Sequence, residues 1–243
     1  MQLRRYRRSW WPGSLPGRSL RRWVVVALGL GVLVTGLAGA AAPYRQTVRF
    51  GEAAVCERDA GGCFGQEAGS IVGRRTYTTT STQTDANGNS STTTTTHYAV
   101  TWQRHDGSQQ DRDVSSSFYD KAQEGQPANL RLWQGEVVGV EVMGGAEWFL
   151  PESGESLGHW LYLAHFGLGV LLWGLLFGWW DGFFMLAFRA FAWMFTSFVP
   201  VSMATDYLAY GLDFGFGSVA TAVFGVFSVV IAGWMLVGSL GRW

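Results

Sequence analysis

The sequence predicts an integral membrane protein in which a membrane α-helical bundle of four spans carries an extracytoplasmic all-β domain, a small antiparallel barrel of the SH3-like or OB-like kind. Two observations predict this fold class. Hydrophobic residues make up 48% of the 243 residues and charged residues only 15%, whereas a soluble domain carries about 25% charged residues. The apolar residues are also gathered in long runs on either side of a polar middle segment. The formal net charge of zero argues against a nucleic-acid partner.

The first predicted element is transmembrane helix 1 over residues 24–42, preceded by a basic cytoplasmic N-terminus over residues 1–23. Residues 1–23 contain seven arginines and no acidic residue. The 19 uncharged residues that follow are long enough, at about 1.5 Å per residue, to cross a bilayer core of about 30 Å. Basic flanks stay in the cytoplasm, so we expect the chain to emerge outside the cell after Ala42.

A cleaved signal peptide is the alternative interpretation of residues 24–42. The basic flank and the small residues Ala38 and Ala40 fit a signal-peptidase site. The apolar run is long for the central region of a signal peptide, however, and Pro43 disfavours cleavage directly after Ala42. We therefore favour a retained anchor.

Three further spans are predicted over residues 158–180, 183–203 and 217–239, because the chain is almost continuously apolar there. Tryptophans at both ends of the first of them are typical of an interfacial belt. Four spans place both termini in the cytoplasm and residues 43–157 outside. The predicted location is the plasma membrane, as a multi-pass protein.

Small residues recur at every fourth position in three of the spans. This spacing lets helix backbones approach one another closely. The residues are Ala27, Gly31, Thr35 and Gly39 in the first span, Gly174 and Gly178 in the second, and Gly217, Thr221 and Gly225 in the fourth. The pattern predicts helix packing, either within the bundle or between copies of the chain.

Arg189 is the only charged residue inside the predicted spans. An arginine at the centre of a bilayer costs several kcal/mol, so such a residue pairs, lines water or reaches the surface. Because it follows the Asp181–Gly182 turn closely, both a buried and an interfacial position are open.

The outer segment, residues 43–157, predicts a β-domain. Short alternating runs separated by turns at Asp106–Gly107 and Gln134–Gly135 indicate five strands. The Thr-rich stretch over residues 78–96 contains Asn87–Gly88, which favours a two-residue hairpin turn. Because threonine favours extended backbone, this stretch is either a protruding hairpin or a mobile loop.

Cys56 and Cys63 are the only cysteines, and they lie in this outer segment. Two cysteines in an oxidising compartment most simply form a disulfide. The alternative is a two-thiolate metal site, which lacks further ligands nearby. We therefore expect a disulfide, and no metal or cofactor.

Several motifs in the outer segment resemble a family of uncharacterised bacterial multi-pass membrane proteins. They run from Gly69-Ser-x-Val-x-Arg-Arg-x-Tyr through Tyr98-x-Val-x-Trp to Tyr119-Asp-Lys-x-x-Glu-Gly-Gln-Pro. In those proteins an extracytoplasmic SH3-like small β-barrel, a domain of unknown function, lies between predicted helices. The resemblance implies a fold and a topology, and it transfers no catalytic or binding residue.

No serine, cysteine or lysine has a base and an orienting partner at catalytic spacing, so an enzyme is not predicted. We expect a non-enzymatic membrane protein whose outer β-domain docks a partner or serves as an accessory subunit of a cell-envelope complex. Its partners would be the lipid bilayer and either an envelope protein or further copies of itself. The alternative is a small transporter or channel subunit, which would bury Arg189 facing hydroxyl groups of the other spans.

Overall fold

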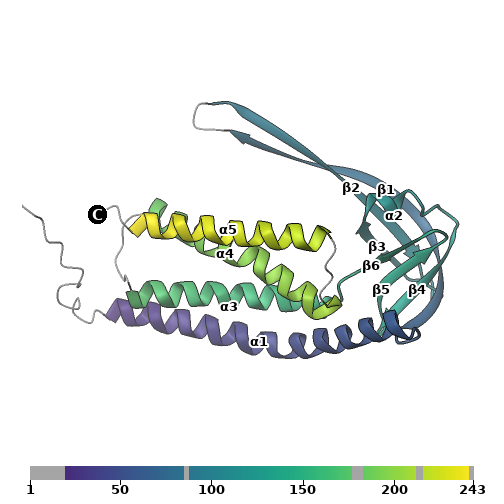
Figure 1. The fold of residues 1–243 in the computed structure, drawn as a ribbon, viewed down its shortest axis with the longest axis horizontal. Coiled ribbons are helices and arrows are strands. Elements are labelled where there is room, and N and C mark those ends of the chain that lie inside the picture. Colours follow the sequence, from purple (N-terminus) through teal and green to yellow (C-terminus); the bar gives the residue numbers. More distant parts are fainter. Residues whose placement is uncertain (1–19, 85–87, 177–182, 212–215, 241–243) are drawn as a thin grey trace, which may run out of the picture. The chain divides into compact units, whose positions relative to one another are not determined.

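The computed structural model describes residues 20–84, 88–176, 183–211 and 216–240 as helices and one β-sheet (Figure 1). The helices are α1 (Leu20–Asp59), α2 (Ser116–Tyr119), α3 (Glu152–Leu176), α4 (Phe183–Tyr210) and α5 (Phe216–Leu240). The strands are β1 (Gly65–Thr84), β2 (Ser90–Gln103), β3 (Gln109–Val114), β4 (Pro127–Trp133), β5 (Glu136–Val142) and β6 (Gly145–Trp148). The chain forms two compact units: a helical unit (Met1–Ala42, Ser156–Ala204, Phe214–Trp243) and a β unit (Pro43–Glu155, Thr205–Asp213).

Three helical segments are long and apolar enough to cross a membrane, namely Arg22–Asp59, Phe184–Tyr210 and Val219–Ser239. Helix α3 is not among these candidates within the described residues. The predicted span 158–180 runs past Leu176 into residues outside the described structure, so the described part of α3 contains only part of it. The described chain therefore offers three candidate spans where the sequence predicted four.

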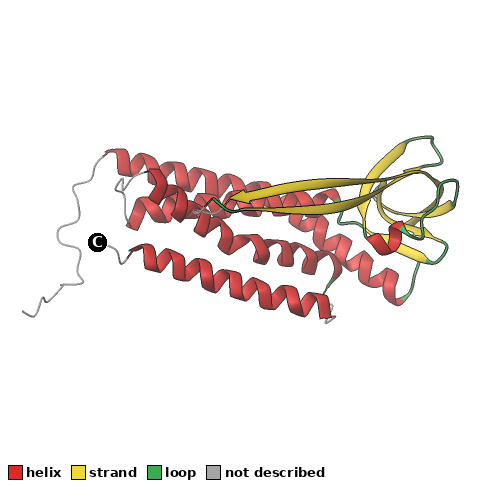
Figure 2. Cartoon of the chain, turned by 90° about the horizontal axis from the view of Figure 1, so that it is seen from above, coloured by secondary structure: helices red, strands yellow, loops and turns green. Residues whose placement is uncertain are grey.

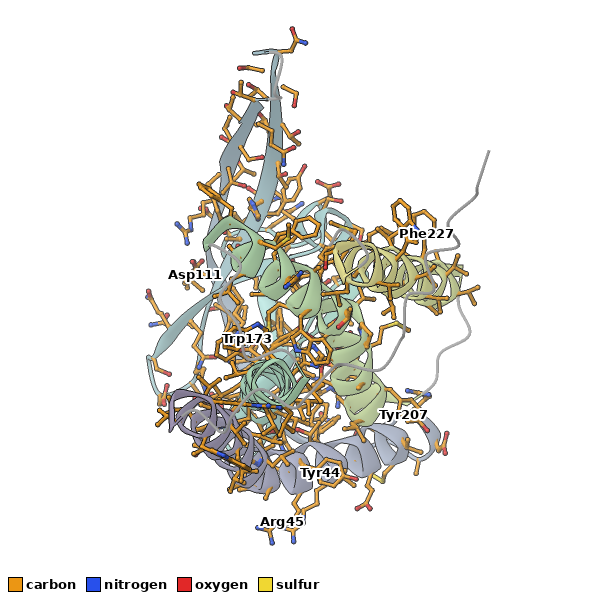
Figure 3. All side chains as sticks on the ribbon, turned by 90° about the vertical axis from the view of Figure 1, so that its left-hand side faces the viewer. Tyr44, Arg45, Asp111, Trp173, Tyr207 and Phe227 are labelled. Carbon is orange, nitrogen blue, oxygen red and sulfur yellow. A yellow bond between two sulfur atoms is a disulfide. The ribbon has the colours of Figure 1, made fainter. Side chains whose placement is uncertain are left out.

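Large apolar side chains cover the outward surfaces of the candidate spans. Phe227 is 60% exposed and points away from the neighbouring helices (Figure 3). On α4 the exposed phenylalanines lie at helical spacing: Phe184, Phe188, Phe191, Phe195 and Phe198. An apolar surface of this extent is typical of proteins that contact lipid or another protein.

Helices α1 and α3 approach each other at glycines spaced by seven residues. A Cβ added to Gly36 would lie 2.6 Å from the backbone nitrogen of Ala164, and one added to Gly29 would lie 2.5 Å from that of Leu171. Seven residues complete almost two whole helical turns, so Gly29 and Gly36 stay on one face.

Most of the predicted stripe of small residues on α1 lies outside the face that contacts α3. Ala27, Gly31 and Thr35 are exposed, and only Gly39 meets α3, where an added Cβ would overlap the Trp160 ring. Each step of four residues turns the helix about 40° past a full turn, so the stripe winds away from the contact face.

Of the other predicted packing residues, some face a neighbouring helix and some do not. A Cβ on Gly174 would lie 3.1 Å from Val26 of α1, and a Cβ on Gly225 would lie 2.8 Å from Val199 of α4. Both glycines therefore face a neighbouring helix. Thr221 is exposed. Gly178 lies outside the described residues, and the surroundings of Gly217 are likewise outside them.

Gly36→Val is expected to lower the free energy of unfolding of the helical unit by about 1–3 kcal/mol, because its side chain must displace the α3 backbone. The matched control is Gly31→Val, where an added Cβ meets nothing within 4 Å. The control is expected to change stability by less than about 0.5 kcal/mol. Thermal unfolding of the purified variants in detergent checks this, and equal losses would contradict the assigned packing face.

Helix α1 does not end at Ala42 as predicted, but continues through Pro43 to Asp59. Pro43 cannot donate a backbone hydrogen bond, which usually ends or kinks a helix. Tertiary packing supports the extension, because Phe50 is 0% exposed in an aromatic cluster. The Phe50 cluster comprises Phe50, Phe64, Val138 and Ala209, with Trp133, Leu150 and Tyr210 packed against it.

The β unit contains one antiparallel sheet, drawn in yellow in Figure 2. Its strand order is β3-β2-β1-β4-β5-β6. The predicted barrel is wrong, because the edge strands β3 and β6 do not pair within the described residues and the sheet stays open. Instead, side chains link the two edges: the backbone N–H and the hydroxyl of Ser115, just after β3, donate to the Glu147 carboxylate of β6 at 3.1 and 2.7 Å.

The sheet has six strands rather than five, and β6 is the one that the sequence did not predict. Its main hydrophobic core contains Trp102, Ile71 and Leu130, all at 0% exposure. Two predicted turns are present: Gly107 and Gly135 adopt φ values of 84° and 88°, in the left-handed region that glycine accommodates without strain. The predicted turn at Asp181–Gly182, and Asn87 of the predicted Asn87–Gly88 turn, lie outside the described residues.

Candidate functional site

Strands β1 and β2 continue as a two-stranded ribbon beyond the ends of their other neighbours (Figure 2). β4 pairs with β1 only as far as Ser70, and β3 pairs with β2 only from Tyr98 onward. β1 and β2 nevertheless stay paired with each other as far as Thr84 and Ser90. This ribbon, residues 77–84 and 90–97, therefore has no strand partner along either outer edge within the described chain.

Hydroxyl groups cover the ribbon, and none of its side chains beyond the Tyr77–His97 pair is even partly buried. Because side chains alternate across a strand, one face is built entirely from threonine and serine. Its cross-strand hydroxyl contacts include Thr82 with Thr92 at 3.3 Å and Thr84 with Ser90 at 3.0 Å. The ribbon is thus an extended hairpin without a hydrophobic core of its own.

A polar cluster secures the base of the ribbon to β3. The Arg75 guanidinium donates to Asp111, and the Tyr77 hydroxyl donates to Asp113 at 2.7 Å. The His97 ring stacks on Tyr77 with centroids 4.7 Å apart, and its Nδ1 lies 3.7 Å from Asp113. The hydrogen bond to Asp113 raises the pKa of Tyr77. Sequence analysis missed this cluster, although the matching two-residue spacing on both strands was a signal for it.

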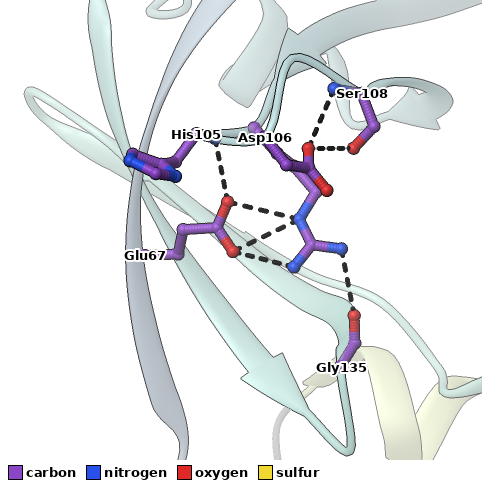
Figure 4. A network of polar contacts seen from close by, with 6 residues as sticks. Glu67, His105, Asp106, Ser108 and Gly135 are labelled. Carbon is purple, nitrogen blue, oxygen red and sulfur yellow. Dashed lines mark hydrogen bonds and ion pairs between the residues drawn. The ribbon is translucent and has the colours of Figure 1, made fainter.

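A second network joins β1 to two turns at one end of the sheet (Figure 4). The Glu67 carboxylate accepts from Arg104 Nη2 at 2.7 Å and from the His105 backbone N–H at 2.9 Å. Arg104 also donates to the Gly135 carbonyl at 3.2 Å, and the Asp106 carboxylate accepts from the Ser108 backbone N–H at 2.9 Å. The hydrogen bond from Arg104, together with that from His105, holds the pKa of Glu67 below its usual value.

The Glu67 network predicts a pH dependence of stability. A carboxyl whose pKa is lower in the folded than in the unfolded state stabilises the fold above the unfolded pKa of about 4.3. That contribution is lost as the pH falls through the lower, folded pKa. We expect the melting temperature of the unmodified chain to exceed that of Glu67→Gln at pH 7, and the difference to shrink below about pH 4.3.

Melting curves of both proteins between pH 7 and pH 3 measure this difference. The control is Asp120→Asn, which removes an exposed carboxylate that forms no ion pair within the described structure. A Glu67→Gln difference that persists at pH 3 would contradict the assignment.

Cys56 and Cys63 lie at disulfide-bonding distance, with 6.0 Å between their Cα atoms. They connect the last turn of α1 to the segment leading into β1. Glu57 stabilises the enclosed loop, because its carboxylate accepts from the backbone N–H groups of Cys63 and Phe64 at 2.7 and 3.2 Å. Its other oxygen accepts from Arg131 of β4 at 3.0 Å. The cysteine pair therefore belongs to a bridge between helix and sheet.

Arg189 is 7% exposed, in the second turn of α4. Its Nε donates to the Ser239 hydroxyl at 3.2 Å, and its Nη2 donates to the Ser239 carbonyl at 3.1 Å. Arg22 plays the same part for α3, donating to the carbonyls of Gly174 at 3.0 Å and of Leu175. Both arginines therefore supply donors to carbonyls in the last turn of a helix, where intrahelical donors are missing.

Comparison of the chain with protein-family models, curated proteins and solved structures finds no significant match. The resemblance to bacterial membrane proteins with an SH3-like domain therefore stays a prediction.

Proposed function

We propose that this chain is a non-enzymatic, multi-pass membrane protein whose outer β unit recruits an envelope protein by adding a partner strand to the ribbon. The observation that carries the proposal is the pair of open backbone edges along residues 77–84 and 90–97. An open edge presents N–H and C=O groups that an incoming extended segment satisfies.

The composition of the ribbon supports an edge that is available for pairing with a partner strand. Proteins normally protect a long open edge with lysine, proline or a bulge. Residues 78–84 and 90–96 contain no charged residue and no proline, and β1 pairs with β2 in regular register there. Because the side chains of the ribbon are mostly hydroxyls, its surface is not hydrophobic. The backbone N–H and C=O groups of its edges are therefore the groups that would hydrogen-bond to a partner strand.

The proposed topology is four spans with both termini in the cytoplasm and residues 43–157 outside. Two buried or partly buried arginines support this orientation. Arg22 contacts the end of α3, and Arg189 contacts the end of α5. The basic residues therefore gather where α1 and α4 begin and where α3 and α5 end, as expected for the cytoplasmic side.

Transport by the bundle is the alternative, and the contacts of Arg189 favour it less. A conducting path needs polar groups in sequence along the membrane normal. Arg189 is buried, but its hydroxyl partner is Ser239 in the last turn of α5. The buried Ser197 hydroxyl donates back to the Met194 carbonyl of its own helix at 2.8 Å. These contacts support helix-end capping rather than a path.

Site-specific photo-crosslinking in the native membrane tests the proposal. A photoreactive amino acid at Thr80 or Thr94, which face each other across the ribbon, is expected to yield one discrete adduct with a second polypeptide. The matched control is the same amino acid at Lys121, an exposed position after α2. Adducts of equal yield from all three positions, or none from the ribbon, would contradict docking there. An adduct of twice the chain's own mass would identify a second copy at the ribbon and would contradict docking of an envelope partner.

A further inference from the structure

A cleft of about 560 Å³ lies in the β unit, where it is lined by residues of β4, β5 and β6 and by the last turns of α1. All of its lining residues belong to the β unit. Its volume falls in the range of about 300–1,000 Å³ that is typical of small-molecule sites. The proposed docking at the ribbon does not use this cleft.

The apolar part of the cleft is built around Trp148, which is 44% exposed. Gly139 of β5 is its cross-strand partner, and a Cβ added to Gly139 would lie 3.0 Å from the indole ring. Because Gly139 has no side chain, the indole can lie close to the strand. Phe64 supports the indole further, with ring centroids 5.6 Å apart. The cleft therefore contains an aromatic surface that is held by its neighbours and is still open to solvent.

Charged side chains complete the lining of the cleft. They are Glu57, Glu141, Glu147, Arg58 and Arg131. Arg58 is exposed, and its guanidinium, which carries five N–H donors, makes one hydrogen bond within the described chain, to the Tyr210 carbonyl at 2.9 Å. The Glu141 side chain is 49% exposed, and one of its oxygens accepts from Arg131 Nη2 at 3.2 Å. Arg58 and Glu141 therefore keep donors and an acceptor for a ligand.

This mixture of groups indicates the chemical class of the ligand. Three carboxylates and two guanidinium groups line the cleft, so an anion and a cation would each meet charges of their own sign. An uncharged ligand with several hydroxyl groups avoids this, because each hydroxyl can donate to a carboxylate and accept from a guanidinium. The open indole favours a ligand that also has an apolar face. A pyranose ring combines these features, with hydroxyls at its edge and C–H groups on its faces.

We propose that this cleft binds an uncharged pyranose unit of a glycan, with one C–H face of the sugar ring on Trp148 and its hydroxyl groups bonded to Arg58 and Glu141. The position of the β unit outside the membrane, which rests on the proposed function, makes an envelope glycan the source of the sugar. Sugar binding is measured on the purified chain without a protein partner, so failure of one proposal leaves the other standing.

Saturation-transfer difference NMR on the full chain tests the site, in a zwitterionic detergent that carries no sugar headgroup. The probes are chitotetraose and cellotetraose, which are uncharged glycans, and tetragalacturonate, a negatively charged glycan of the same length. We expect signals from the C–H protons of one ring face with at least one of the uncharged glycans. We expect none with tetragalacturonate, because its carboxylates would meet the three carboxylates of the cleft.

Trp148→Leu keeps an apolar side chain beside Gly139 but removes the flat ring, and it is expected to weaken glycan binding about tenfold. The matched control is Trp234→Leu, the same change at an indole of α5 that is 77% exposed and outside the cleft, which is expected to leave binding unchanged. Glu141→Ala removes an acceptor and is expected to weaken binding about fivefold; it decides the matter if Trp148→Leu does not fold. Binding of neither uncharged glycan, equal binding of tetragalacturonate, or full binding by the folded Trp148→Leu variant would overturn the proposal.

Discussion

Phe50→Ala is expected to lower the free energy of unfolding of the β unit by about 3–5 kcal/mol, the usual cost of emptying a buried phenylalanine site. The ring is 0% exposed and lies 5.5 Å from Phe64, 5.9 Å from Trp133 and 5.8 Å from Tyr210, measured between ring centroids. Neighbours from α4, from the segment before β1 and from β4 would all lose contacts. Because small domains are stable by only about 5–15 kcal/mol, this one change removes much of the margin.

The measurement is thermal unfolding of the full chain in detergent, followed by protease sensitivity of the β unit. Tyr44→Ala is the matched control, since Tyr44 lies on the same helix but is 49% exposed. It is expected to change stability by less than about 0.5 kcal/mol. If Phe50→Ala is as stable as the control, the extension of α1 beyond Pro43 does not depend on the Phe50 cluster.

Shortening the ribbon is expected to reduce co-purification of the partner at least about tenfold, because strand addition takes its affinity from main-chain hydrogen bonds along the edge. A suitable variant joins Thr78 directly to Thr96 through Asn-Gly, a sequence that supports a two-residue hairpin turn. Thr78 and Thr96 are cross-strand partners, so the pairing below them is retained. The Arg75–Asp111 and Tyr77–Asp113 contacts at the base are also retained.

The control keeps the backbone edge and changes the side chains. Replacing Thr79, Thr93 and Thr95 by serine leaves hydroxyl groups on the ribbon and its length unchanged. This serine variant is expected to co-purify with most of the partner. The shortened variant is expected to lose the partner although its melting temperature stays the same as that of the unmodified chain. Loss in both variants would point to recognition of threonine side chains instead of strand addition.

The parts of the fold that local patterns encode were predictable. Uncharged apolar runs indicated the candidate spans, and β-branched residues with the Asp106–Gly107 and Gln134–Gly135 turns indicated antiparallel strands. The ribbon also follows from local preference, since threonine favours extended backbone and residues 78–96 contain few alternatives. The predicted span over residues 158–180 runs past the described end of α3 at Leu176, so it stays a prediction.

Features that depend on distant contacts were not predictable. Pro43 suggested the end of α1, but packing of Phe50 against Phe64, Trp133 and Tyr210, which are 14, 83 and 160 positions later, overrides it. Barrel closure required β3 to pair with β6, and Ser115 and Glu147 connect those edges through side chains instead. The burial of Arg189 depended on contacts with Ser239, 50 residues later in the chain.

The most direct test of the docking proposal is the native mass of the protein purified in mild detergent from its own membrane, compared between the unmodified chain, the serine variant and the shortened ribbon. We predict a stoichiometric second polypeptide with the first two proteins and its absence from the third. A lone or purely homo-oligomeric unmodified chain, or a second polypeptide that the shortened variant retains in full, would contradict docking of an envelope partner at the ribbon.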